Sequence, residues 1–112
     1  MRLNQFLFVC TANMLRSPTG EHVARRLGFT ADSAGTESFA VRRLTKEAID
    51  RAQRIWCMEQ HHADAVIELS PNRADAVTCL NIPDDFNYCD RMLIETFEKL
   101  LEPYARVYYP RR

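Results

Sequence analysis

Short apolar runs alternate with longer amphipathic stretches along this chain. The first run, residues 6–10, is apolar at every position, which is typical of a strand buried on both faces. Similar strand candidates follow at 29–33, 54–58 and 76–80. Helical patterns occupy the intervals, at 17–27, 45–53, 59–69 and 92–101. This alternation predicts an α/β fold, a small doubly wound sheet of about four parallel strands with helices on both faces.

The junction between the first predicted strand and helix carries clear boundary signals. Ser17 is a residue type favoured at a helix N-cap, and Pro18 suits the first helical position. Gly28 suits the end of the same helix. We therefore expect the helix to begin at Ser17. Ligands of such sheets bind outside the carboxyl ends of the strands, so we expect the functional site directly after Cys10.

Length, charge and cysteine content narrow the class of protein. The 112 residues make a single domain, 1–112, with a core of its own. Lys plus Arg and Asp plus Glu both number 15, which argues against nucleic acid or a membrane surface as partner. The four cysteines show no C-x-x-C pair and no zinc-ligand spacing, so no metal and no cofactor is expected. The first apolar run is too short for a signal peptide, and free thiols suit a cytoplasmic setting.

Residues 10–17 form a C-x5-R-S motif. With four Cys and 13 Arg in the chain, about half of one C-x5-R pair is expected by chance, so the spacing alone is weak. The context is more specific, because the cysteine ends a buried strand and the arginine opens a helix. A loop of this kind turns its backbone N–H groups and the positive end of the helix toward a tetrahedral oxyanion. Arg16 then adds two parallel donors, which predicts a phosphate-binding loop after the first strand.

The same residues suggest a reaction. The positive field of the loop favours the thiolate form of Cys10, and a thiolate held against phosphorus is an in-line nucleophile. The hydroxyl of Ser17 can hydrogen-bond the sulfur and help it to leave in a second step. The alternative is a buried structural Cys10 with Arg16 on the helix surface.

Three segments, 9–18, 32–36 and 55–58, resemble the low-molecular-weight protein tyrosine phosphatases. The resemblance implies that Cys10 attacks phosphorus, that Arg16 binds the phosphoryl group, and that an aspartate on a late loop is the general acid. It also implies a hydrogen bond from Asn13 to Ser33 that holds the loop in shape. The phosphate-binding residues implied in this way are Thr11, Ala12, Asn13, Met14, Leu15, Arg16 and Ser17.

The chain departs from the family pattern in three places. Ala12 stands where the family usually has glycine, so the turn must tolerate a methyl group. Leu15 stands where many members have a second cysteine, which can protect the nucleophile as a disulfide. Most members are also longer between Thr36 and Ile55, a stretch that helps to wall the substrate crevice, so the shortening bears on substrate preference.

The general acid must lie within residues 81–88. The family pattern is Asp-Pro followed by an aromatic residue, and aligning it with Asp84-Asp85-Phe86 selects Asp84. A shift of one residue selects Asp85 instead, and both alignments stay open. Phe86 and Tyr88, together with Phe39, are expected to wall an aryl substrate, and packing of these rings on their own domain is the alternative.

These observations predict metal-independent hydrolysis of aryl phosphate monoesters, phosphotyrosine foremost, through a phosphocysteine intermediate. The substrate would be a phosphorylated protein or a small aryl phosphate, and inorganic phosphate the product. One alternative is an arsenate reductase that uses Cys79 and Cys89 as redox thiols. Another is a phosphotyrosine-binding module without turnover. His61 and His62 are expected to have structural or solvent-facing roles.

Overall fold

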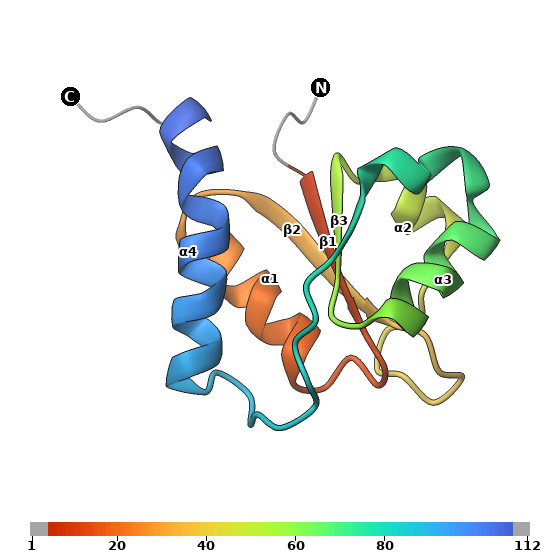
Figure 1. The fold of residues 1–112 in the computed structure, drawn as a ribbon, viewed down its shortest axis with the longest axis horizontal. Coiled ribbons are helices and arrows are strands. Elements are labelled where there is room, and N and C mark those ends of the chain that lie inside the picture. Colours follow the sequence, from red (N-terminus) through yellow and green to blue (C-terminus); the bar gives the residue numbers. More distant parts are fainter. Residues whose placement is uncertain (1–4, 109–112) are drawn as a thin grey trace.

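A computed structural model describes residues 5–108 and contains one sheet of four parallel strands. The strands are β1 (Gln5–Cys10), β2 (Thr30–Gly35), β3 (Arg54–Cys57) and β4 (Val77–Cys79). Their order across the sheet is β2-β1-β3-β4, and every pair is parallel (Figure 1). The predicted α/β fold is confirmed, and β1 lies inside the sheet with its carboxyl end beside those of β2 and β3.

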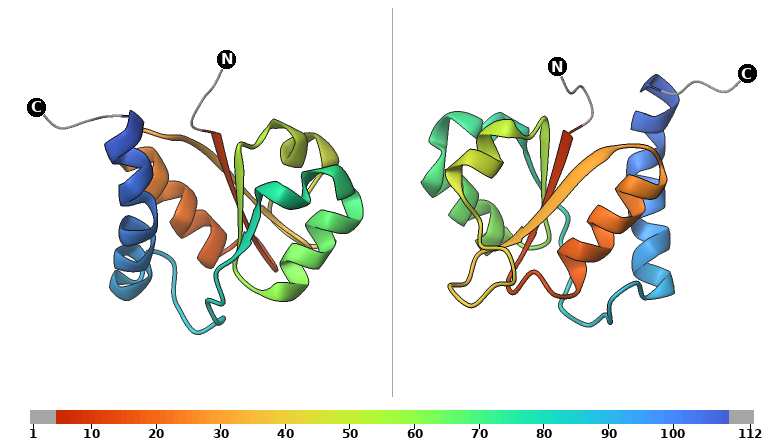
Figure 2. Two further views of the ribbon diagram at one scale, coloured as in Figure 1. Left: turned by 45° about the horizontal axis from the view of Figure 1, so that its top comes forward. Right: turned by 180° about the vertical axis from the view of Figure 1, so that it is seen from behind.

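Helices cover both faces of the sheet (Figures 1 and 2). On one face lie α1 (Arg16–Arg26) and α4 (Arg91–Tyr108), which pack on each other. On the other lie α2 (Lys46–Arg51) and α3 (Gln60–Leu69), and the short 3₁₀ helix η1 (Pro71–Ala76) leads from α3 into β4. None of the described helices is long and apolar enough to cross a membrane.

The first apolar run is buried because its side chains alternate between two cores. Phe6, Phe8 and Cys10 belong to the core under α1 and α4. Leu7 and Val9 belong to the core under α2 and α3. A strand inside a parallel sheet has no solvent-facing side, which explains why the run shows no polar position.

The start of α1 differs from the prediction. The helix begins at Arg16, and its N-cap is Leu15, which makes no side-chain capping bond. The hydroxyl of Ser17 lies instead between Asn13 and Cys10, inside the loop. The N-cap prediction for Ser17 is therefore wrong, because the contacts of its hydroxyl across the loop replace a local capping bond. The predicted end is confirmed, since Gly28 follows the helix with a left-handed φ of 95°.

The last helix is longer than its apolar pattern predicts. It continues from Leu101 to Tyr108 through Pro103, a residue that removes one helical hydrogen bond. Tyr104 packs edge-on against Phe6 and Trp56, with ring centroids 5.4 and 5.6 Å apart. These contacts hold the last turns of α4 on the sheet despite the proline. Residues 109–112 lie outside the described part of the chain.

Candidate active site

Residues 11–15 connect β1 to α1 at the carboxyl end of the sheet, and Asn13 holds this loop in shape. Its φ is 56°, a left-handed conformation that asparagine tolerates better than most residues. Its Nδ2 donates to Ser17 Oγ at 2.9 Å and to Ser33 Oγ at 2.8 Å. Its Oδ1 accepts the backbone N–H of Arg42 at 3.2 Å. The buried amide thus joins the loop to α1, to β2 and to the segment after β2.

A buried carboxylate supports this arrangement from behind. Glu21, in α1, accepts the Ser33 hydroxyl at 2.5 Å and the Arg42 Nη2 at 2.5 Å. It also pairs with Arg25 Nη2 at 2.7 Å. The sequence predicts no role for Glu21 or Arg42, because nothing in their local pattern shows that they meet. Together they fix the Ser33 hydroxyl, which in turn holds Asn13.

Cys10 ends β1 with its side chain 3% exposed. Its Sγ lies 2.9 Å from Ser17 Oγ. Ser17 Oγ accepts the amide of Asn13, so its own hydrogen is available to the sulfur; the Ala34 carbonyl lies farther away, at 3.4 Å. The structure therefore places these two side chains as the motif predicts.

Arg16 is buried, and its guanidinium is held by two firm contacts. Nη1 donates to Glu59 Oε2 at 2.5 Å and to the Ile82 carbonyl at 2.8 Å. Nε lies 3.6 Å from Asp84 Oδ1. The hydrogen bond from Arg16 holds the pKa of Glu59 below its usual value, against the opposing effect of desolvation. Glu59 was not predicted as a site residue, and it lies 43 positions from Arg16 in the chain.

Thr11 and His62 form a second contact between the loop and α3. The Thr11 Oγ1 lies 2.9 Å from His62 Nε2, and the backbone N–H of Glu59 donates to His62 Nδ1 at 3.0 Å. His62 is fully buried, and this desolvation, with smaller effects of His61 and Arg16, lowers its pKa to about 4. The structural role predicted for His62 is therefore a role within the site.

The side chains of Glu59, His61 and His62 offer ligand atoms within 4.8 Å of one another, the arrangement among the described residues that most resembles a metal site. Their hydrogen bonds do not fit a metal. The Glu59 carboxylate is paired with Arg16, and both ring nitrogens of His62 are already bonded. A metal would have to break these contacts, so the donor set does not support a metal-binding role.

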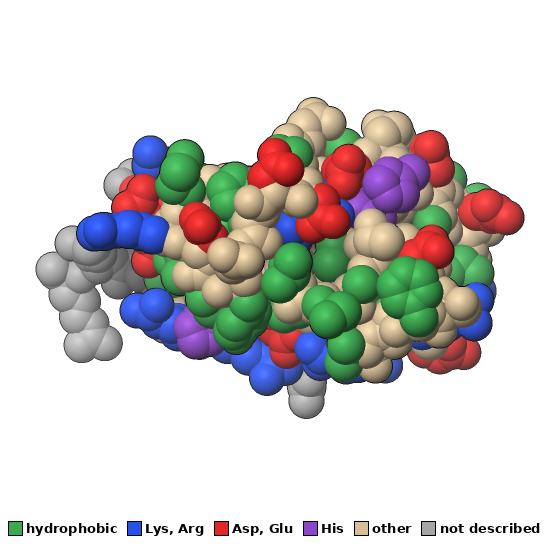
Figure 3. Space-filling view, turned by 90° about the horizontal axis from the view of Figure 1, so that it is seen from below, with side chains coloured by type: hydrophobic (Ala, Val, Ile, Leu, Met, Phe, Trp, Pro, Cys, Tyr) green, Lys and Arg blue, Asp and Glu red, His purple; other side chains and the backbone are tan. Residues whose placement is uncertain are grey.

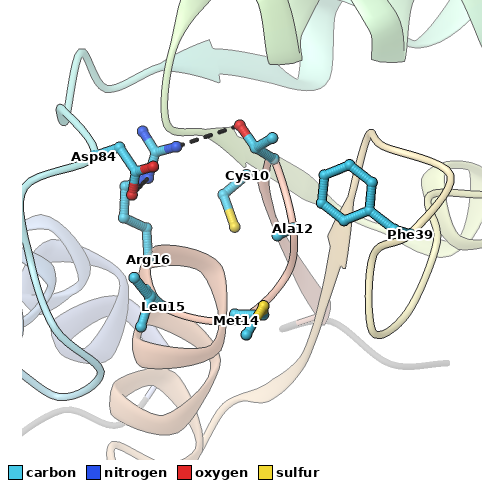
Figure 4. A pocket seen from close by; sticks show the side chains of 8 residues that line it. Cys10, Ala12, Met14, Leu15, Arg16, Phe39 and Asp84 are labelled. Atoms are coloured by element: carbon cyan, nitrogen blue, oxygen red, sulfur yellow. Dashed lines mark hydrogen bonds and ion pairs between the residues drawn. The ribbon is translucent and has the colours of Figure 1, made fainter.

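A cavity of about 310 Å³ opens over the loop (Figure 4). Figure 3 shows the face that carries it, with hydrophobic side chains gathered there and carboxylates along one side. The sulfur of Cys10 points into the cavity, and Phe39 and Asp84 lie on opposite sides of it. The lining residues are Cys10, Thr11, Ala12, Met14, Leu15, Arg16, Phe39 and Asp84.

Of the three aromatic residues expected to wall the substrate, Phe39 lines the cavity, with 69% of its surface exposed. Phe86 packs instead against the core under α1 and α4. Tyr88 lies beside His22, with ring centroids 6.4 Å apart. Neither ring lines the cavity, so the structure favours the alternative that these rings pack on their own domain.

The two adjacent aspartates differ in position. Both are exposed, but Asp84 lines the cavity and approaches Arg16 Nε, whereas Asp85 is not among the lining residues. The geometry therefore favours the alignment that selects Asp84.

Ala12 stands where the family usually has glycine. Its φ is not among the positive values of the described chain, so this position does not require a glycine.

Cys79, one of the two cysteines proposed as redox thiols, lies away from Cys10 in the sheet. Val9 pairs with Cys57 and Cys57 with Cys79, so β3 separates Cys79 from β1. Two strand spacings amount to roughly 10 Å, beyond the limit of about 7 Å between Cα atoms for a disulfide. Burial, together with the charge of Cys79, raises the pKa of the Cys57 thiol to about 12. Cys79 is therefore not positioned to relay electrons to Cys10.

Comparison with known proteins adds the family. The sequence pattern of the family described as low molecular weight phosphotyrosine protein phosphatase matches residues 5–99. The chain belongs to this family. It is therefore a phosphatase of the low-molecular-weight protein tyrosine phosphatase type, as the motif and its resemblance predicted. A comparison with curated proteins gave no match.

Solved structures of similar fold include the tyrosine phosphatase Wzb from Escherichia coli K30, in complex with phosphate. It is 21% identical, with a TM-score of 0.74 and coverage of 96% of this chain and 99% of Wzb. The YwlE arginine phosphatase from Geobacillus stearothermophilus is 21% identical, with a TM-score of 0.70 and coverage of 97% and 99%. The tyrosine phosphatase amsI from Erwinia amylovora is 24% identical, with a TM-score of 0.64 and coverage of 95% and 90%. At these identities the likeness concerns the fold.

Proposed function

We propose that this phosphatase hydrolyses aryl phosphate monoesters, phosphotyrosine foremost, without a metal and through a phosphocysteine on Cys10. The observation that carries the proposal is that Cys10, Arg16 and Asp84 border one cavity. A nucleophile, a phosphate-binding cation and a proton donor are the three groups the reaction needs. The substrate is a phosphorylated protein or a small aryl phosphate, and the product is inorganic phosphate.

The donors of Arg16 leave one edge for the substrate. Nη1 is occupied by Glu59 and by the Ile82 carbonyl. The Nε and Nη2 groups form the other edge of the guanidinium, where the contacts with Asp84 Oδ1 at 3.6 Å and Thr11 Oγ1 at 3.5 Å are long. This edge can bind two phosphoryl oxygens in parallel. The positive end of α1 supports the same anion. This arrangement holds the phosphorus close to the sulfur of Cys10.

In the first step the thiolate of Cys10 attacks phosphorus, and the S–P bond forms as the bond from phosphorus to the aryl oxygen breaks. Asp84 gives its proton to the leaving oxygen. In the second step Asp84 takes a proton from water, the water oxygen bonds to phosphorus, and the S–P bond breaks. The Ser17 hydroxyl, 2.9 Å from the sulfur, stabilises the departing thiolate.

The cavity walls favour an aryl group. Ala12, Met14, Leu15 and Phe39 present apolar surface to the space above Cys10. A ring gains from burial against such surface, whereas a guanidinium loses hydration there without enough acceptors. Because the structurally similar YwlE is an arginine phosphatase, phosphoarginine is the comparison that tests this preference.

The test measures release of para-nitrophenol from para-nitrophenyl phosphate with and without EDTA. We expect EDTA to leave the rate unchanged. Cys10→Ser is expected to abolish turnover and to keep binding of inorganic phosphate, since a serine alkoxide does not form at neutral pH without a base. Arg16→Ala is expected to lose both turnover and binding of inorganic phosphate. Substantial turnover by Cys10→Ser, or a rate that EDTA removes, would contradict the proposal, and faster hydrolysis of phosphoarginine than phosphotyrosine would contradict the substrate class.

A further inference from the structure

Thr11, directly after the nucleophile, lines the cavity, and two other side chains contact its hydroxyl. His62 Nε2 lies 2.9 Å from Thr11 Oγ1, and Arg16 Nη2 donates to the same oxygen at 3.5 Å. Figure 4 draws the contact from Arg16 as a dashed line. His62 stands in the first turn of α3, so the contact joins two elements that are 51 positions apart in the chain.

The proton of the His62 ring is located by its other contact. The backbone N–H of Glu59 points to Nδ1 at 3.0 Å, and an amide N–H can only donate. Nδ1 therefore carries a lone pair, and the single proton of the neutral ring lies on Nε2. Nε2 thus donates to Thr11 Oγ1. The ring is fully buried and stacks on His61, with centroids 4.0 Å apart, so its orientation is held.

The two N–H groups that reach Thr11 Oγ1 determine the direction of its own hydrogen. A hydroxyl oxygen has two lone pairs and one hydrogen. His62 and Arg16 direct their N–H groups to the lone pairs, which leaves the hydrogen for an acceptor on the cavity side. The acceptor that a phosphate-binding loop brings there is an oxygen of the phosphoryl group.

We propose that the Thr11 hydroxyl donates a hydrogen bond to a phosphoryl oxygen and that His62 is a positioning residue that aims it. The inference rests on the proposed function, since it needs a phosphoryl group in the loop. A hydroxyl fixed in direction before substrate binds stabilises the added charge without reorganisation. It adds a side-chain donor to the backbone N–H groups of the loop, and its bond to an anion is of the stronger, charge-assisted kind.

The test is a double-mutant cycle with Thr11→Val, His62→Leu and the double variant, measured as kcat/KM on phenyl phosphate and as inhibition by vanadate. Thr11→Val is expected to lower kcat/KM and vanadate affinity about 10- to 100-fold, the range for a hydrogen bond to a charged group. If His62 acts through Thr11, the kcat/KM of the double variant is no lower than that of the less active single variant. If His62 has a purely structural role, the fold-losses in kcat/KM of the two single variants multiply in the double variant. That result would overturn the assignment of His62 as a positioning residue.

Two further variants separate aiming from folding. His62→Gln keeps an N–H group that reaches toward Thr11 and is expected to retain most of the rate. His62→Asn keeps an acceptor for the Glu59 N–H but does not reach Thr11, so it is expected to fold and to lose as much rate as Thr11→Val. Thr11→Ser keeps the hydroxyl and most of the activity. Glu68, an exposed residue farther along α3, supplies the matched control, since Glu68→Gln is expected to leave the kinetics unchanged.

The outcomes distinguish this inference from the proposed function. If the wild-type protein neither hydrolyses phenyl phosphate nor binds vanadate, the proposed function fails and the inference fails with it. If the wild-type protein is active and Thr11→Val stays within about two-fold of it, well below the value of such a bond, only this inference is overturned. If His62→Leu does not fold, the comparison of His62→Gln with His62→Asn decides, and equal rates for those two variants overturn the role of His62.

Discussion

Arg16 is the largest fully buried side chain of the described chain, and its charge explains much of the site. A buried guanidinium is costly unless acceptors surround it. Glu59 and the Ile82 carbonyl meet that need on one edge, so the other edge can bind substrate without leaving the charge unpaired. The same logic applies to Asn13, whose amide reaches three partners within 3.2 Å.

At the residue scale, Asp84→Asn is expected to slow hydrolysis of phenyl phosphate by about 10²- to 10⁴-fold, because the leaving phenolate needs a proton. The loss on para-nitrophenyl phosphate is expected to be much smaller, since its leaving group departs without that help. The measurement is kcat on both esters for the wild-type protein and the variant.

The neighbouring carboxylate provides the control for this prediction. Asp85→Asn removes an exposed charge that does not line the cavity, so a small change that is equal for both esters is expected. If Asp85→Asn is the variant whose rate depends more steeply on the leaving group, then the general acid is Asp85 and the alignment of the loop is shifted by one residue.

A second prediction at this scale concerns oxidation. Leu15 occupies the position of a protecting cysteine, and β3 separates Cys79 from the strand of Cys10. Peroxide is therefore expected to inactivate the protein by oxidising Cys10 through sulfenic acid to higher states, without a disulfide. Mass spectrometry after mild treatment measures the products. A disulfide from Cys10 to Cys79 or Cys89 would contradict this and favour the reductase alternative.

At the scale of elements, the packing of α1 on β1 depends on Gly20. A Cβ added there lies 2.5 Å from Cδ1 of Phe8, a ring that is fully buried and has no room to move. Alanine gains up to about 1 kcal/mol of helix propensity, but overpacking costs about 1–3 kcal/mol. We expect Gly20→Ala to lower the free energy of unfolding by about 1–2 kcal/mol, measured by urea denaturation.

The control for this substitution lies on the same helix. Arg26 is exposed, so Arg26→Ala is expected to change the free energy of unfolding by no more than about 0.5 kcal/mol. A Gly20→Ala variant that is more stable than the wild-type protein would show that Phe8 can move aside, and that the contact between α1 and β1 is looser than the structure indicates.

At the scale of the whole molecule, stability is expected to fall with acid. The pKa of His62 is lowered from 6.5 to about 4, so between these values the unfolded chain binds a proton that the folded chain does not. The neutral His62 ring contributes on the order of 3 kcal/mol to the free energy of unfolding. This contribution is fully present above pH 6.5 and is lost as the pH falls toward 4. The lowered pKa of Glu59 acts in the same direction at more acidic pH.

Urea denaturation at several values between pH 7 and pH 4 measures this dependence. His62→Gln removes the titrating ring, so its free energy of unfolding is expected to fall less steeply than that of the wild-type protein over this range. Equal slopes for the two proteins would contradict the assignment of a neutral, buried His62 as a source of the dependence.

The sequence alone predicted the parallel strands and the loop that holds the candidate site. The all-apolar run at β1 predicts a strand buried on both faces, because only such a strand has no solvent-facing position. The motif from Cys10 to Ser17 predicts a loop between a strand end and a helix start, because its residues are consecutive in the chain. Both features depend on neighbours in sequence, which a pattern can show.

The tertiary structure decided which side chains support that loop. Glu59 and His62 meet Arg16 and Thr11 because β3 pairs in parallel with β1, which brings α3 to the same end of the sheet. Their partners lie 43 and 51 positions away, so no local spacing predicts them. The contacts of the Ser17 hydroxyl with Cys10 and Asn13 likewise depend on how the loop folds back over the start of α1, so the helical pattern did not predict them. Hydrophobic periodicity and motif spacing depend on residues that are close in the chain, so a sequence pattern shows them. Hydrogen bonds between distant side chains depend on the order in which the strands pack, which only the tertiary structure shows.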